Sequence, residues 1–596
     1  MMKKNFLIPF TIFILVSLVF SWPVFQNIKN WGKMDWDEVF FWSAVARDTI
    51  LKYRQIPLWN PYAQPEGSLV FLAYPNSHFL SPFFLLIITF GVVYGLKLLI
   101  PIHLSIGLLG MYYLSRHFKL SGISSYLAAF VYMLNSIFSL HLAEGHFEWL
   151  TMAFVPWLIL GLLKSVKKPI HTLSAALAFA LIILAGSVDV LSIIVLFLII
   201  LSCFLALQKR SLLIFKRLIF IFGITFLLCS VKLLPMLEYL STFSRKTYYS
   251  GKTQPSTLGT ILLAHQQADL YTKTKWYSPK MKTEYGKRLG ISHGWHEYGA
   301  YTGIAPILLS IVGLFASFKR YWPWAIAAAM FLLISLGDIL WGLGFWNILH
   351  SLSFYQWLQV PSRFILGLII SLSLFAGIGL DKIKANKTGK TSILTVILLF
   401  VILIDFYIVN IPIWKQAFTV VPPKNIQRNS VFVQKAEFDS FTYKNEMRGG
   451  RYLAYLVNEG ILKKVSFDID SPQGTVKAVS SPDYKGEAYF AGVKGQLKIE
   501  YFSPNKIILN LKTKVDDILV LNQAYYRGWQ IKAAKSARVS PYKGLISAKV
   551  SPGEYKIVFY FLPISFIIGS AVSLLTAAVC LYYLFAGYFK KTDVLS

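Results

Sequence analysis

Residues 171–210 read HTLSAALAFALIILAGSVDVLSIIVLFLIILSCFLALQKR. The stretch contains two apolar runs, 171–187 and 188–207, with Asp189 at the tip between them and a basic pair at the end. Each run is long enough to cross a bilayer as a helix, allowing for tilt. Because basic residues favour the cytoplasmic face, this stretch predicts two transmembrane helices joined on the outer side.

The rest of the chain repeats this pattern. Of its 596 residues, 55% are hydrophobic and 15% charged, and the mean hydropathy is +0.55, which is too apolar for a soluble protein of this size. The N-terminal run, 6–22, follows two lysines, and no small-residue cleavage site comes after it. We therefore expect this run to be a membrane helix that is kept rather than a cleaved signal peptide. The ten other runs that we expect to span are 6–22, 96–115, 122–140, 148–163, 218–235, 299–317, 322–337, 364–380, 391–410 and 561–588, which gives about twelve helices in all.

Basic residues mark alternate gaps between these runs. With the N-terminus inside, every predicted cytoplasmic gap is basic and the C-terminus is also inside. This pattern accounts for the net charge of +31 and argues against a nucleic-acid partner. We therefore expect a multi-pass protein of the plasma membrane. The basic residues are Arg116, Lys119, Lys164, Lys167, Lys168, Lys209, Arg210, Lys216, Arg217, Lys319, Arg320, Lys382, Lys384, Lys387, Lys390, Lys590 and Lys591.

Three larger segments fall on the outer side. The predicted transmembrane module, 1–410, has a long first loop at 23–95 and a second at 236–298. Segment 411–560 changes to short β-branched and aromatic stretches separated by turn formers, which predicts an antiparallel sandwich of the jelly-roll or immunoglobulin-like kind. The last segment, 561–596, is a helix with a short cytoplasmic tail. The fold class is thus a polytopic α-helical membrane protein with a C-terminal extracytoplasmic β-sandwich domain.

The first outer loop carries a dense acidic motif. Asp35, Asp37 and Glu38 stand within four residues, among tryptophans and phenylalanines. An ordinary solvated loop is the alternative, but the aromatic and apolar surroundings favour a functional role. A carboxylate there could act as a general base or bind a divalent cation.

Basic residues lie at the outer ends of other helices. Lys97, Lys232 and Arg363 are candidates to hold a phosphate group. Snorkelling or a salt bridge would explain a basic helix end equally well.

Two further polar groups lie in outer gaps. Glu144 and His146, with Glu148, are candidate substrate-binding residues, and a tight loop that satisfies its own polar groups is the simpler alternative. Glu297 is also a candidate substrate-binding residue. It follows His293 and His296, whose spacing is a weak zinc signal that we do not read as a site. Asp189 and Asp338 are expected to be helix-terminal residues.

Several motifs together resemble a known family. The chain is similar to the bacterial YfhO-like membrane proteins, members of the GT-C glycosyltransferase superfamily, over nearly its whole length. The motifs are Asp35-Trp36-Asp37-Glu38, Arg47-Asp48-Thr49-Ile50, Ile56-Pro57-Leu58-Trp59-Asn60-Pro61-Tyr62, Leu80-Ser81-Pro82-Phe83, Glu144-Gly145-His146, Phe154-Val155-Pro156-Trp157, Glu297-Tyr298-Gly299-Ala300-Tyr301-Thr302-Gly303, Val360-Pro361-Ser362-Arg363-Phe364, Tyr525-Tyr526-Arg527-Gly528-Trp529 and Ser551-Pro552-Gly553-Glu554-Tyr555.

The resemblance implies a transferase that takes a sugar from a polyprenyl-phosphate-linked donor in the lipid bilayer. Its acceptor would be an envelope glycan, a glycolipid or a teichoic-acid-like polymer. Asp37, aided by Asp35, would deprotonate or orient the acceptor, and Lys232 and Arg363 would neutralise the leaving phosphate. In some relatives the acidic motif binds a divalent cation such as Mg²⁺ or Mn²⁺, for which Asp35 and Asp37 are the candidate ligands.

Two alternatives stay open. A flippase for a lipid-linked sugar would place ionisable groups at mid-membrane, and Asp405 is the nearest such group. A non-catalytic protein of envelope assembly would not need the acids. In the sandwich, Trp529, Tyr525 and Tyr526 either bind the acceptor glycan or fill the domain core.

Overall fold

A computed structural model of the chain describes residues 2–63, 70–242, 253–274, 284, 286–337, 344–385, 393–435, 450–462, 476–492, 495–533 and 537–592. Asp338, Lys387 and Lys390 lie outside these residues. The chain forms two compact units. The first consists of Met1–Lys33, Leu96–Thr225 and Thr247–Thr419, and the second of Met34–Gly95, Phe226–Lys246 and Val420–Ser596.

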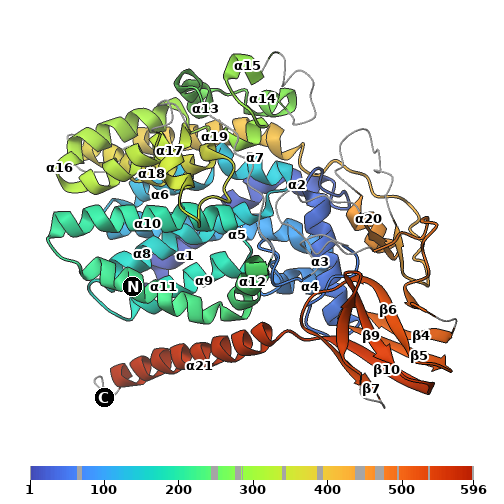
Figure 1. Cartoon of the computed structure of the whole chain (residues 1–596). Coiled ribbons are helices and arrows are strands. Elements are labelled where there is room, and N and C mark those ends of the chain that lie inside the picture. Colours follow the sequence, from blue (N-terminus) through green and yellow to red (C-terminus); the bar gives the residue numbers. More distant parts are fainter. Residues whose placement is uncertain are drawn as a thin grey trace. The chain divides into compact units, whose positions relative to one another are not determined.

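The first unit is helical (Figure 1). Its long helices follow the apolar runs of the sequence, because a backbone in a bilayer must satisfy its own hydrogen bonds. The helices are α1 (Met2–Ser21), α2 (Pro23–Gln26), α5 (Val92–His117), α6 (Gly122–Met133), α7 (Ser136–Glu144), η1 (Phe147–Phe154), α8 (Val155–Ser165), α9 (His171–Leu184), α10 (Val188–Lys209), α11 (Leu213–Leu228), η2 (Pro255–Thr257), α13 (Leu258–Leu263), α14 (Gln267–Lys273), α15 (Gly286–Leu289), η4 (Trp295–Glu297), α16 (Ile304–Ser335), α17 (Phe345–His350), η5 (Pro361–Phe364), α18 (Ile365–Ala385) and α19 (Ile393–Trp414).

The described residues contain eight helices long and apolar enough to cross a membrane, or nine if the bent pair of α11 and α12 (Ser230–Thr242) is one span. Two further apolar helices, Leu7–Ser21 and His171–Leu184, are shorter. The predicted runs 299–317 and 322–337 both fall on α16, which is kinked at Tyr321, just before Pro323. A proline removes a helical hydrogen bond and clashes with the preceding turn, which explains the kink. The multi-pass architecture is confirmed, while the count of twelve and the sidedness stay predictions.

Helices α16 and α18 pack closely through glycines. A methyl group added at Gly313 would lie 2.0 Å from the carbonyl oxygen of Phe375, and one at Gly379 would lie 1.9 Å from that of Leu309. Small residues are typical of membrane helix contacts, because dispersion contacts rather than water exclusion hold such helices together. Both glycines therefore lie where no larger side chain fits.

The second unit combines helices with a β-sandwich (Figure 1). The sandwich consists of two four-stranded antiparallel sheets of order β4-β5-β10-β7 and β3-β6-β9-β8, as the sequence predicts. Strands β1 and β2 form a separate two-stranded parallel sheet. The elements are α3 (Trp36–Leu51), α4 (Phe84–Phe90), α12, β1 (Val433–Lys435), α20 (Arg451–Leu456), β2 (Glu459–Ile461), β3 (Ala488–Phe490), β4 (Gln496–Ser503), β5 (Lys506–Thr513), β6 (Asp517–Ala524), β7 (Trp529–Ala533), β8 (Val539–Tyr542), β9 (Leu545–Val550), β10 (Gly553–Phe561) and α21 (Ile564–Thr592).

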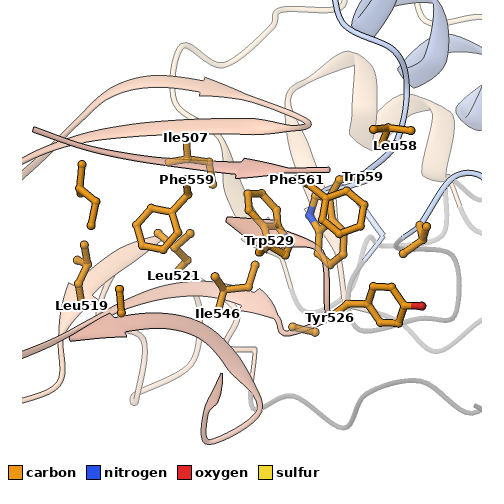
Figure 2. Close-up of a cluster of buried hydrophobic side chains, with 14 of the residues drawn as sticks. Leu58, Trp59, Ile507, Leu519, Leu521, Tyr526, Trp529, Ile546, Phe559 and Phe561 are labelled. Carbon is orange, nitrogen blue, oxygen red and sulfur yellow. The ribbon is translucent and has the colours of Figure 1, made fainter. Parts of the chain in front are cut away.

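The sandwich core receives a tryptophan from the first loop. Figure 2 shows Trp59 beside Trp529 and Phe561, and the Trp59 and Trp529 ring centroids are 5.3 Å apart. The Trp59 indole donates to Gln523 Oε1 at 2.8 Å, so its polar edge is satisfied inside the core. Trp529 and Tyr526 are buried in the same cluster, which matches the core alternative rather than glycan binding.

Candidate functional sites

Asp37 lies in the first turn of α3 and is fully buried. Its Oδ2 accepts the backbone N–H of Arg451 at 2.8 Å, and its Oδ1 accepts that of Tyr452 at 3.1 Å. These are the first two residues of α20, whose leading N–H groups have no partner within the helix. Burial raises the pKa of Asp37 to about 7, against the lowering effect of these hydrogen bonds. Asp37 therefore caps α20 from a distant part of the chain.

Glu38 points to a more open environment. Its side chain is 31% exposed, and its Oε1 accepts the hydroxyl of Tyr74 at 2.5 Å and the indole N–H of Trp42 at 3.4 Å. The Trp42 and Tyr74 rings stack at 4.6 Å with an interplanar angle of 8°. Arg451 Nη1 lies 3.6 Å from the same oxygen. Glu38 thus combines partial exposure with a stacked aromatic pair and a guanidinium, and within that set Trp42 and Arg451 are buried while Tyr74 is partly exposed.

Asp35 is the residue before α3 and is partly exposed, and its side chain makes no capping bond to that helix. Both oxygens of Asp37 already accept backbone N–H groups. The divalent-cation site at Asp35 and Asp37 stays a prediction.

Lys232 holds the loop segment that carries Tyr74. Its buried ammonium donates to the carbonyl oxygens of Pro75 at 2.9 Å and Ser77 at 2.6 Å. In the same segment His78 Nε2 lies 3.0 Å from Ser43 Oγ on α3, and burial lowers the pKa of His78 to about 4. These contacts place the segment against α3, where Tyr74 reaches Glu38.

Lys97 has an equivalent role in the first unit. Its Nζ donates to the carbonyl oxygens of Asn27 at 2.8 Å and Ile28 at 3.0 Å, and it lies 4.7 Å from the ring centroid of Phe418. An ammonium that donates to carbonyls at the end of a chain turn stabilises that turn. The observed contacts of Lys97 are thus structural.

A second polar cluster surrounds Arg363, on η5 of the first unit. Its Nη1 donates to Asp189 Oδ2 at 2.6 Å, while Nε and Nη2 donate to the two oxygens of Glu297 at 2.6 and 2.5 Å. The Ser362 hydroxyl also donates to the Glu297 carbonyl at 2.7 Å. Burial acts to raise the pKa of Glu297, but the Arg363 guanidinium holds it well below its usual range. Arg363 therefore forms a partly buried salt bridge, which is one of the alternatives considered for it in the sequence analysis.

Histidines and acids from two segments meet beside this pair. Gly145, with φ of +104°, ends α7 and turns the chain so that His146 Nδ1 lies 2.8 Å from His141 Nδ1. Glu144 Oε2 accepts the hydroxyl of Tyr271 at 2.8 Å and lies 3.7 Å from His296 Nδ1. Glu148, on η1, is buried in the same unit.

Arg451 and Tyr74, which contact Glu38, and Tyr271, which contacts Glu144, were not predicted from the sequence. Arg451 is 414 residues from Asp37 along the chain, and nothing in its local sequence marks it as a partner of the acidic motif. His141 and His296 carried a signal, since each lies within five residues of another histidine or glutamate, but only the fold brings the two segments together.

No protein-family model matches the sequence, and no curated protein matches it. Among solved structures, the crystal structure of ArnT from Cupriavidus metallidurans bound to undecaprenyl phosphate is similar at 11% sequence identity. That match has a TM-score of 0.37 and covers 77% of this chain and 86% of the other. At this TM-score the likeness assigns no substrate and no residue role here. Membership of the YfhO-like family and of the GT-C superfamily stays a prediction.

Proposed function

We propose that the chain is a membrane glycosyltransferase of GT-C type that takes a sugar from a polyprenyl-phosphate-linked donor. The observation that carries the proposal is Glu38, a partly exposed carboxylate beside a stacked Trp42–Tyr74 pair and the guanidinium of Arg451. Tyr74 is the partly exposed member of the pair and would supply the apolar face on which a sugar ring packs, while Trp42 is buried. A carboxylate and a cation side by side suit a reaction that takes a proton from a hydroxyl and releases a phosphate.

In the proposed reaction, an acceptor hydroxyl attacks the anomeric carbon of the donor. The new bond joins the acceptor oxygen to that carbon, and the bond from carbon to phosphate oxygen breaks with its electron pair leaving on the polyprenyl phosphate. Glu38 takes the acceptor proton as general base, and attack from the opposite side inverts the anomeric centre. Arg451 meets the charge that develops on the leaving phosphate.

Asp37 acts as a positioning residue in this proposal. It is buried and accepts the first two N–H groups of α20, so it fixes the backbone that carries Arg451 beside Glu38. This differs from the expectation that Asp37 itself takes the proton, because its exposed area is about 1% while the Glu38 side chain is 31% exposed. Asp35 contributes to the negative field at the start of α3.

The transporter alternative has weaker support in the described residues. Asp405, on α19, accepts the hydroxyl of Tyr301 at 2.7 Å and lies 3.3 Å from His265 Nε2. These contacts give Asp405 fixed partners within the first unit.

The test is a donor panel. Full-length protein in detergent is incubated with polyprenyl-phosphate sugars and candidate glycan and lipid acceptors, with and without divalent metal, and released polyprenyl phosphate is measured. Turnover of at least one donor supports the proposal. Specific donor binding without any release, combined with donor movement across reconstituted vesicles, would favour the flippase instead. Absence of binding across the whole panel would favour the assembly protein.

A further inference from the structure

Three side chains in the first unit converge as metal ligands do. One ligand atom each of His141, His146 and Glu297 lies within 4.8 Å of the others, and all three residues are buried. Four ligands at about 2.0–2.1 Å from a tetrahedral Zn²⁺ lie roughly 3.3 Å apart, so small side-chain shifts bring these atoms to that spacing. Two imidazoles and a carboxylate are a donor set that occurs in zinc sites.

His296 supplies an independent sign of a missing partner. Its side chain is 8% exposed, and among the residues that the structure describes its Nδ1 has no hydrogen-bond partner. That atom faces Glu144 Oε2 at 3.7 Å, while its Nε2 lies 3.5 Å from Glu297 Oε1. A histidine that binds a metal through one nitrogen commonly donates its other N–H to a carboxylate. In His296 the nitrogen beside the ligand Glu297 is Nε2, and the nitrogen that faces the second carboxylate, Glu144, is Nδ1.

The surroundings hold the ligands in place. The Trp149 ring stacks flat on His141 at 3.7 Å with an interplanar angle of 7°. Arg363 fixes both oxygens of Glu297, and the Tyr271 hydroxyl fixes Glu144. Ligands oriented by such outer contacts lose little freedom when an ion binds.

The charges also favour a cation. Four carboxylates gather here, on Glu144, Glu148, Asp189 and Glu297. Arg363 pairs with Asp189 and Glu297, while the buried Glu144 accepts the hydroxyl of Tyr271. Buried carboxylates are costly unless they are paired, and a divalent ion bound here would offset the charge of Glu144 and Glu297.

We propose that His141, His146 and Glu297, with His296 as fourth ligand, bind one divalent transition-metal ion of the zinc class. Imidazole nitrogens select zinc-like ions over Mg²⁺ or Ca²⁺, which prefer oxygen ligands. Four protein ligands leave no open position, so the ion is structural and ties the end of α7 to η4. The site does not depend on the proposed transferase reaction.

The test measures metal binding without any activity assay. Full-length protein in detergent is treated with a chelator, desalted and titrated with Zn²⁺ alone against a chromophoric competitor, and bound metal is counted by elemental analysis. We expect wild type to bind one Zn²⁺ per chain. We expect the His141→Gln and His146→Gln variants to bind Zn²⁺ with an affinity at least tenfold lower. His350→Gln is the matched control, because that histidine contacts the carbonyl of Leu358 and lies outside the ligand set.

A second measurement covers variants that fail to fold. Co²⁺ bound to wild-type protein at the same stoichiometry should give the visible bands of a four-coordinate ion, and Zn²⁺ should displace it. Failure of wild type to bind Zn²⁺, or a Co²⁺ complex without those bands, would overturn the proposal. So would folded His141→Gln and His146→Gln variants that bind Zn²⁺ as tightly as wild type, since an ion bound elsewhere would then explain the stoichiometry.

Discussion

The Asp37 carboxylate accepts the backbone N–H of Arg451 at 2.8 Å, although the two residues are 414 positions apart in the chain. The bond joins the start of the long first loop to the start of α20 (Figure 1). Arg451 Nη1 also lies 3.6 Å from Glu38 Oε1. Asp37 therefore holds the backbone of the residue whose guanidinium pairs with Glu38.

Removing the Asp37 acceptor should destabilise α20. Asp37→Ala leaves two buried N–H groups without a partner, whereas Asp37→Asn keeps one acceptor oxygen for them. Both variants are uncharged at this position, so the comparison isolates the hydrogen bonds. We expect the Ala variant to be less stable than the Asn variant by about 1–2 kcal/mol, measured by urea unfolding in detergent. Equal stability of the two variants would argue against the cap.

The ionisation of Asp37 should make stability depend on pH. Burial raises the folded-state pKa from the ordinary value of 3.8 to about 7, so the folded protein keeps a proton that the unfolded chain releases. This contribution is complete below about pH 4 and is lost as the pH rises to 7, by about 1.4 kcal/mol per pH unit while one proton separates the two states. The Tm of wild type minus that of Asp37→Asn should fall between pH 4.5 and 7.5. A Tm difference between wild type and Asp37→Asn that does not change with pH would contradict the raised pKa of Asp37.

The apolar runs, basic gaps and turn-separated strands were enough to predict a multi-pass helical protein with a C-terminal sandwich, because both patterns are local. The partners of the candidate sites were not predictable in this way. Asp37 and Arg451, or His141 and Glu297, meet only through the fold, and each looks ordinary in its own segment. Trp59 likewise has the sequence context of a loop residue, yet it lies in the core of a sandwich whose strands are more than 400 residues later in the chain.

The pair of Arg363 and Glu297 should be strongly coupled. Arg363→Met leaves the carboxylates of Glu297 and Asp189 without their guanidinium, which should cost about 3–5 kcal/mol of unfolding free energy. Adding Glu297→Gln in a double-mutant cycle should recover about 1–3 kcal/mol. Arg527→Met serves as the control, because its pair with Glu238 is about half exposed on the arginine side and should cost less than about 1 kcal/mol. Additive effects at Arg363 and Glu297 would contradict the coupling.

Trp59 should anchor the first loop on the sandwich. Its ring is fully buried, so Trp59→Ala should cost about 3–5 kcal/mol and increase hydrogen exchange in the neighbouring residues 55–63. Val515→Ala, at an apolar residue of the same unit that is 43% exposed, should cost less than about 0.5 kcal/mol. Unchanged exchange in the first loop would show that this contact does not hold it.

The most direct measurement of the central claim is single-turnover release of polyprenyl phosphate by wild type and Glu38→Gln, with donor affinity measured in parallel. Loss of a general base predicts a rate lower by about 10²- to 10⁴-fold with donor affinity unchanged within a few-fold. Asp483→Asn, at a carboxylate 76% exposed on the second unit, should keep the wild-type rate. A Glu38→Gln enzyme that releases polyprenyl phosphate as fast as wild type would contradict the account.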